Sequence, residues 1–209
     1  YTNFLLVDEI NRLTPKTQGA FLEAMSEKQA TIDGLTYPIN DPFIVIATQS
    51  FHESGSTFPL ILSQKDRFMF SLVLKQLDEN GELEVLRRIN TGELEWQNFF
   101  DNLNAQTDIE TLQFMIRFVG SIIVDERVLT YIRDIVMATR KHADIRMGAS
   151  TRASVAFVKG IKALAALGNR RYAIPDDVKE IAPAVLRHRI ELQSEARIRG
   201  KTEEQIIQE

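Results

Sequence analysis

Hydrophobic and polar positions divide the chain into two parts of different character. Residues 4–7 and 43–47 are short, wholly apolar runs that end in polar residues. Such runs are typical of strands buried on both faces, as in a parallel sheet covered by helices. Residues 68–74 are a candidate third strand. The pattern therefore predicts an α/β part with a sheet of three strands.

Turn and cap signals lie between the first two predicted strands. Thr14 and Pro15 predict a helix start, because a hydroxyl can cap the first turn and proline suits the first helical position. Residues 30–39 then predict a hairpin, with Asp33 and Gly34 in its two-residue turn. Residues 51–65 are rich in Ser, Gly and Pro, and they predict a loop.

After about residue 75 the apolar spacing becomes helical. Residues 128–139 repeat apolar side chains at the helical period, and residues 153–167 are apolar on nearly all sides, which predicts a buried central helix. Pro175 begins another helix, which Pro183 is expected to kink or divide. Residues 187–209 mix both signs of charge and are predicted to form a solvated helical end.

These patterns give a domain organisation of an α/β part followed by an all-α part. We place the α/β part at 1–75, a connecting helix and linker at 76–104, and the all-α part at 105–209. Open parallel sheets usually have more than three strands, so we expect the fold to be incomplete on its N-terminal side.

Composition narrows the classes of function. The formal net charge of -4 argues against a nucleic-acid partner, since such proteins usually carry a basic stripe. The absence of cysteine excludes disulfides and thiolate metal sites, and a cytoplasmic location is the default expectation. No apolar run approaches the ~20 residues that a membrane span requires.

Candidate chemistry begins at Asp8 and Glu9, which directly follow the first predicted strand. Ligands of open α/β sheets bind at the carboxyl ends of the strands. An acid there can hold Mg²⁺ directly or through a water, and the next acid can orient an attacking water. Strands also end in polar residues simply because they meet solvent, and the pair alone does not separate these readings.

A second candidate lies at the start of the buried helix. Ser150 is a good helix cap, which places Arg152 in the first turn. A cation there opposes the helix dipole, and a bound anion near the helix start would offset that cost. The alternative is an arginine that simply points into water.

Residues 5–48 resemble the MoxR branch of the AAA+ ATPases, and residues 170–189 resemble the lid signature of the same family. The resemblance covers nearly the whole chain, in order, through several separated motifs. It implies a partial P-loop-type AAA+ parallel-sheet core followed by a helical lid domain. The hairpin at 30–39 would then be either a pore-facing insertion or a plain surface hairpin.

The resemblance also implies roles for single residues. Asp8 and Glu9 match the Walker B pair, with Asp8 as the Mg²⁺ ligand. Residues 48–50 fall at the end of the strand that carries sensor 1, with Ser50 at the sensor position and Gln49 as the alternative source of an amide. Arg67 lies in the segment that supplies the arginine finger, which acts on a neighbouring subunit's nucleotide; its alternative is an ion pair with a local carboxylate. Arg152 matches sensor 2 and would bind phosphate. The implied cofactors are ATP and Mg²⁺.

The chain departs from the family pattern in three places. No GxxxxGK[ST] occurs, so the 209 residues alone are expected to bind ATP poorly and to be inactive, with the phosphate-binding loop expected before Tyr1. Ser50 stands where the family has Asn. Leu62 stands where the segment before the finger usually has an acid. The last two changes question efficient hydrolysis.

Three functions are weighed on this basis. The first is an ATPase that works as a homo-oligomeric ring, expected to be a hexamer, and remodels or assembles partner proteins, among them proteins with von Willebrand factor A domains. The second is a hydrolysis-deficient scaffold with the same fold. The third, a helical nucleic-acid binder, is disfavoured by the acidic net charge.

Overall fold

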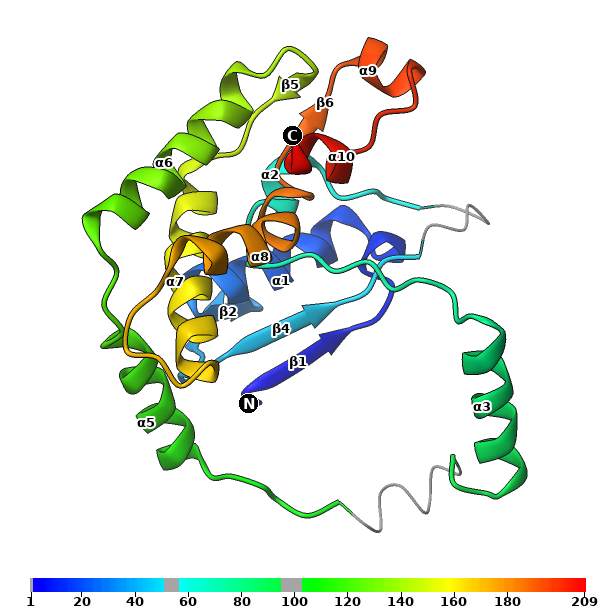
Figure 1. The fold of residues 1–209 in the computed structure, drawn as a ribbon. Coiled ribbons are helices and arrows are strands. Elements are labelled where there is room, and N and C mark those ends of the chain that lie inside the picture. The colour runs from blue at the N-terminus through cyan, green and yellow to red at the C-terminus, as the bar shows by residue number, and fades with distance from the viewer. Residues whose placement is uncertain (1, 51–56, 95–102) are drawn as a thin grey trace. The chain divides into compact units, whose positions relative to one another are not determined.

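The computed structural model describes residues 2–50, 57–94 and 103–209 (Figure 1). The chain forms two compact units, one made of residues 1–71 and 119–209 and the other of residues 72–118. The second unit contains α3 (Glu79–Asn90) and nearly all of α5 (Ile109–Gly120). None of the described helices combines the length and apolar character that crossing a bilayer demands.

The sheet of the first unit pairs β1 (Phe4–Val7) with β4 (Ile44–Ala47) in parallel, as Figure 1 shows. One face of the pair packs on a small apolar cluster that includes Val7, Ile10 and Leu60. The expectation of burial on both faces is wrong for these strands, because alternate side chains point to the other face and lie exposed in this chain. Those exposed side chains are Phe4, Leu6, Ile44 and Ile46.

Local signals between the two strands produced the predicted elements. The Thr14 side chain accepts a hydrogen bond from the Thr17 N–H, and α1 (Pro15–Glu27) begins at the proline. Ile32 pairs with Leu35 across the predicted hairpin, so Asp33 and Gly34 form its turn with φ of 51° and 78°. The remaining elements of this region are η1 (Ile10–Arg12), β2 (Gln29–Ile32), β3 (Leu35–Pro38) and α2 (Leu62–Lys65).

The larger apolar core lies among three helices. These are α6 (Glu126–Lys141), α7 (Thr151–Leu167) and α8 (Pro175–Leu186). Phe157 and Ile161 of α7 are completely buried, which confirms the predicted central helix. Helix α8 runs through Pro183 without interruption, so the proline does not divide it.

The chain after α8 is not the solvated end that its charge pattern predicted. Ala196 and Ile206 are buried in the same core as α7. Apolar residues spaced between the charges account for this packing, because only one side of each short element faces water. The elements after α8 are β6 (Glu191–Leu192), which pairs with β5 (Ile145–Met147) from before α7, and the helices α9 (Ser194–Ile198) and α10 (Glu203–Gln208).

The predicted third strand at 68–74 does not form. Its backbone groups are bonded to the end of α8 instead of to a neighbouring strand. Arg189 Nη1 donates to the Met69 carbonyl at 3.0 Å, and the Ser71 N–H donates to the Ala184 carbonyl at 2.9 Å. His188 Nε2 lies 2.9 Å from the Phe68 carbonyl, and it must be the donor because a carbonyl only accepts.

Arg189 is therefore expected to be essential for the stability of the fold. Its side chain is 2% exposed and forms an ion pair with Asp66, so Arg189→Met would leave a buried carboxylate short of its main partner. The free energy of unfolding should fall by roughly 3–5 kcal/mol in urea denaturation. Arg127→Met, which removes a solvent-exposed ion pair with Asp125, is the matched control and should leave the midpoint nearly unchanged. Equal midpoints for both variants would contradict this role.

His188 should make stability depend on acidity. Burial lowers the pKa of His188 from 6.5 to about 4, so between these values the unfolded chain binds the proton and the folded chain does not. Stability from this residue is complete above pH 6.5 and is lost as pH falls through about 4, by about 3 kcal/mol. His188→Gln keeps a donor for the Phe68 carbonyl but cannot titrate. Its denaturation midpoint should fall less steeply between pH 7 and pH 4, and a slope equal to that of the wild type would refute the assignment.

Candidate functional site

Asp8 and Glu9 lie at the carboxyl end of β1, where the chain turns sharply. Glu9 adopts a left-handed backbone conformation, with φ 48° and ψ 53°, which is unusual for a residue with a side chain. Its N–H donates to Thr48 Oγ1 at 2.8 Å, and the Thr48 hydroxyl donates in turn to the Asp8 carboxylate. The Thr48 hydroxyl, at the end of β4, thus bonds to both Asp8 and Glu9.

The backbone ladder continues past the strands at the same place. The Thr48 N–H donates to the Val7 carbonyl, and the Ile10 N–H donates to the Thr48 carbonyl, both at 3.0 Å. These bonds keep Thr48 beside the turn, so its hydroxyl is positioned by the parallel pairing itself. Sequence reasoning gave Thr48 no role of its own, although a hydroxyl directly after the second apolar run was a visible signal.

The Glu9 carboxylate is accessible. It forms an ion pair with Arg12 Nε at 2.9 Å, and the two side chains are 35% and 48% exposed. Ion pairs at such exposure are weak, so Glu9 can exchange this partner for another at little cost. Asp8 is exposed as well.

Ser50 is joined to the same region through its backbone. Asn11 Nδ2 donates to the Ser50 carbonyl at 3.1 Å, and the Phe58 N–H donates to the Asn11 carbonyl at 2.7 Å. Asn11 is buried in η1, directly after the turn formed by Asp8 and Glu9, which we call the acidic turn. The structure therefore ties the strand end that carries Ser50 to the segment that carries Glu9.

Arg67 lies apart from these residues, immediately after α2. Its side chain is exposed, and Nη1 donates to Ser26 Oγ in α1. Among the described residues, no ion pair joins Arg67 to a local carboxylate, and the adjacent Asp66 bonds to Ser150, Arg152 and Arg189.

Asp66 is the centre of a buried polar cluster. Its side chain is 10% exposed; Oδ1 accepts from Arg189 Nε at 3.0 Å, and Oδ2 accepts from Ser150 Oγ at 2.7 Å and from Arg152 Nη1 at 3.3 Å. Burial lowers the pKa of the Arg189 guanidinium, and the facing Asp66 opposes that shift. Ser150 caps α7 as predicted, through the Arg152 N–H. The sequence did not reveal that Asp66 joins Arg189 to this helix start.

The donor set at the acidic turn fits Mg²⁺. Within the described residues, no group of three or more His, Cys, Asp or Glu side chains could enclose a metal ion. Magnesium, however, is usually held by one or two carboxylates and completes its octahedron with water and substrate phosphates. Asp8, exposed at the strand end, would hold the ion, and Mg²⁺ would there neutralise phosphate charge.

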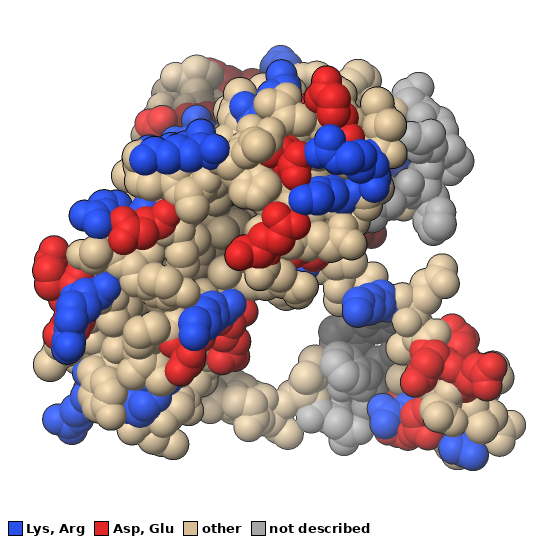
Figure 2. Space-filling view, turned by 45° about the horizontal axis from the view of Figure 1, so that its top comes forward, with Lys and Arg blue, Asp and Glu red and all other residues tan. Residues whose placement is uncertain are grey.

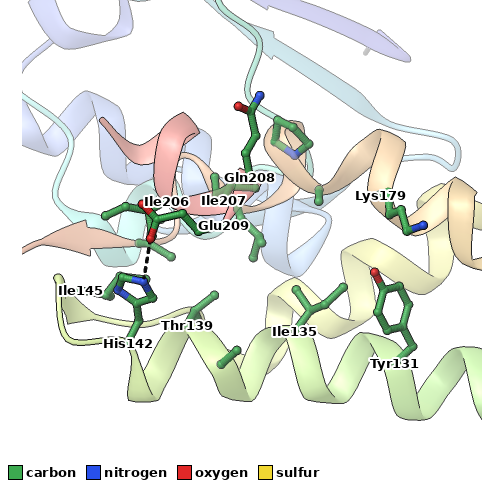
Figure 3. A pocket seen from close by; sticks show the side chains of 15 residues that line it. Tyr131, Ile135, Thr139, His142, Ile145, Lys179, Ile206, Ile207, Gln208 and Glu209 are labelled. Carbon is green, nitrogen blue, oxygen red and sulfur yellow. Dashed lines mark ion pairs between the residues drawn. The ribbon is translucent and has the colours of Figure 1, made fainter. Parts of the chain in front are cut away.

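Other surfaces of the described chain do not share this chemistry. A cavity of about 650 Å³ lies between α6, α8 and α10, with the His142–Glu209 ion pair of 3.3 Å at one end and mostly apolar walls (Figure 3). It contains none of the residues named above as site candidates. On the face drawn in Figure 2, acidic and basic side chains are interspersed, as expected for an ordinary protein surface.

Comparisons with known proteins agree with this arrangement. Residues 1–70 match the model of the ATPase family associated with various cellular activities (AAA), and residues 137–209 match that of the AAA lid domain. The chain is 41% identical to the uncharacterized protein YeaC of Bacillus subtilis over 207 residues, which are 99% of this chain and 63% of YeaC. It is 35% identical to the chaperone MoxR1 of Mycobacterium tuberculosis over 203 residues, covering 93% of this chain and 52% of MoxR1.

A solved structure is similar along nearly the whole chain. The crystal structure of a candidate ATPase from Cytophaga hutchinsonii superimposes with a TM-score of 0.89 at 38% identity, covering 99% of this chain and 64% of that protein. The chain thus spans about half to two-thirds of the length of these relatives. Sequence, lid and fold agree in order along the chain, and the chain belongs to the MoxR-type AAA+ ATPases.

Proposed function

We propose that the chain supplies the hydrolytic part of a Mg²⁺-ATP site. Asp8 serves the metal, Glu9 orients the attacking water, and Ser50 assists at the sensor position. Arg67 and Arg152 stabilise phosphate charge. The observation that carries this proposal is the parallel β1–β4 pair, which brings the acidic turn and the Thr48 hydroxyl to one edge of the sheet.

The position of Arg67 supports an assembly of several copies of the protein. Its guanidinium is exposed and, in the described part of the chain, is held by a serine hydroxyl and by no carboxylate. Such an arginine is free to reach the nucleotide of a neighbouring subunit and stabilise the transferring phosphoryl group. We therefore propose a homo-oligomeric ring, with a hexamer as the expected form.

For the whole protein we propose a cytoplasmic remodelling ATPase. Its cycle would act on partner proteins, with von Willebrand factor A domains as the expected partner class. One relative, MoxR1, is named a chaperone, which supports this class of activity. The second candidate is a scaffold that does not hydrolyse ATP. It is favoured by Ser50, whose hydroxyl is shorter than an asparagine amide and offers one donor where the amide offers two.

Glu9→Gln in the full-length protein tests the hydrolytic role directly. The amide cannot accept a proton from water but keeps the size of the side chain, so nucleotide binding should persist while kcat falls by roughly 100-fold or more. Calorimetric ATP titration and a steady-state ATPase assay measure the two quantities. Glu23→Gln, an exchange in α1 outside the acidic turn, is the control. Turnover of Glu9→Gln at the control rate would rule out the assignment, whereas absence of turnover in both the wild type and the control would favour the scaffold.

Thr48 should act on the acidic turn and not on nucleotide affinity. Thr48→Val keeps the shape but removes the acceptor of the Glu9 N–H and the donor to Asp8. We expect kcat to fall about tenfold with KM for ATP nearly unchanged, as for the loss of hydrogen bonds that position a reacting group. Thr48→Ser restores the hydroxyl and should recover most of the rate. A serine variant as slow as the valine variant would show that the methyl group, and not the hydroxyl, is required.

A further inference from the structure

We propose that Asp66 is a positioning residue that binds Arg152 when no phosphate is present and releases it when a phosphate group binds. This exchange of partners would couple Arg152 to Arg67. The inference rests on the phosphate-binding role proposed above for Arg152. It adds a residue to which the motifs gave no task of its own.

The two oxygens of the Asp66 carboxylate have unequal partners. Oδ1 bonds to Arg189, whose side chain is 2% exposed, whereas Oδ2 bonds to Arg152, whose side chain is 55% exposed. Removing Arg189 from the pair would leave a buried carboxylate short of its main partner, which is costly. Arg152 can leave at little cost, because solvent already hydrates half of its side chain. Arg189 is thus the fixed partner of Asp66, and Arg152 is the exchangeable partner.

Arg152, the exchangeable partner, lies where a phosphate oxygen would be favoured. Ser150 caps α7, a helix of 17 residues, and Oδ2 of Asp66 accepts from the cap hydroxyl at 2.7 Å and from Arg152 in the first turn at 3.3 Å. Helix starts favour negative charge, and arginine favours bidentate partners. Asp66 gives Arg152 only a single long contact, so a phosphate group can offer the guanidinium more. Two anions at one guanidinium repel each other, which makes Asp66 and phosphate competitors.

Asp66, which carries this carboxylate, directly precedes Arg67 in the chain. The backbone between them is held by the last turn of α2, since the Asp66 N–H donates to the Leu62 carbonyl at 2.9 Å and the Arg67 N–H donates to the Gln64 carbonyl at 3.2 Å. Arg189 also fixes the residues that follow, through the Met69 carbonyl. A change of partner at Oδ2 is therefore transmitted to Arg67 through a short, bonded segment.

An NMR titration of the full-length protein with inorganic pyrophosphate tests the coupling without requiring hydrolysis. The Arg152 Nε–Hε signal should shift, and the backbone amides of Arg67 and Phe68 should shift with the same saturation curve. Arg88, which is paired with Glu84 on α3, is the internal control and should not respond. A shift at Arg152 with silent amides at Arg67 and Phe68 would overturn the coupling.

Asp66→Asn tests the competition. The amide keeps hydrogen bonds for Arg189 and Ser150 but removes the competing charge, so pyrophosphate should bind about tenfold more tightly. Asp176→Asn removes the same charge from an exposed ion pair with Lys179 and should leave the affinity unchanged. Unchanged or weaker binding by Asp66→Asn would overturn the proposal. If this variant does not fold, the titration of the wild-type chain decides alone.

The outcomes separate this inference from the proposed function. If Arg152 of the wild-type chain does not respond to pyrophosphate at all, its phosphate-binding role fails and the inference fails with it. If Arg152 responds but Asp66→Asn binds no more tightly, the phosphate role survives and only the part assigned to Asp66 is refuted.

Discussion

The buried ion pair between Asp66 and Arg189 is the constraint on which the rest of the first unit depends. It fixes the segment after α2 to the end of α8, and through Ser150 it reaches the start of α7. A buried pair of this kind is not replaceable one partner at a time, because the remaining charge would lie in a poorly hydrated place without its main partner. The position of Arg67 follows from this pair, since Arg67 is its immediate neighbour in sequence.

The acidic turn depends on a second, smaller constraint. Glu9 occupies a left-handed conformation that costs free energy, and the surrounding structure must compensate for it. The parallel register places Thr48 beside the turn, where its hydroxyl serves both the Glu9 N–H and the Asp8 carboxylate. Residual strain at a site held by a few specific bonds is consistent with a role in chemistry. The two constraints lie on different elements, and each fixes the position of charged side chains for which we propose a role at phosphate.

The sequence predicted well those features that depend mainly on residues close together in the chain. The α1 cap at Thr14, the hairpin turn at Asp33 and Gly34, and the buried helix at 153–167 all depend on neighbours within a few residues, and the structure confirms them. The failed strand at 68–74 depends on Arg189, about 120 residues further along, which no periodicity reveals. The same holds at the site: motifs indicated Asp8 and Arg152, whereas the tasks of Thr48 and Asp66 exist only through partners distant in sequence. The roles of the motif residues and the boundaries at 75 and 105 stay predictions.

A double-mutant cycle on the Asp66–Arg189 pair tests the central claim most directly. Urea denaturation would be measured for the wild type, for Asp66→Asn, for Arg189→Gln and for the double variant. If the pair holds the segment to α8, each single change should cost several kcal/mol, and the double variant should be hardly less stable than either, so that the coupling energy nearly equals the cost of one single change. Losses that simply add, with no coupling between the two positions, would contradict the account.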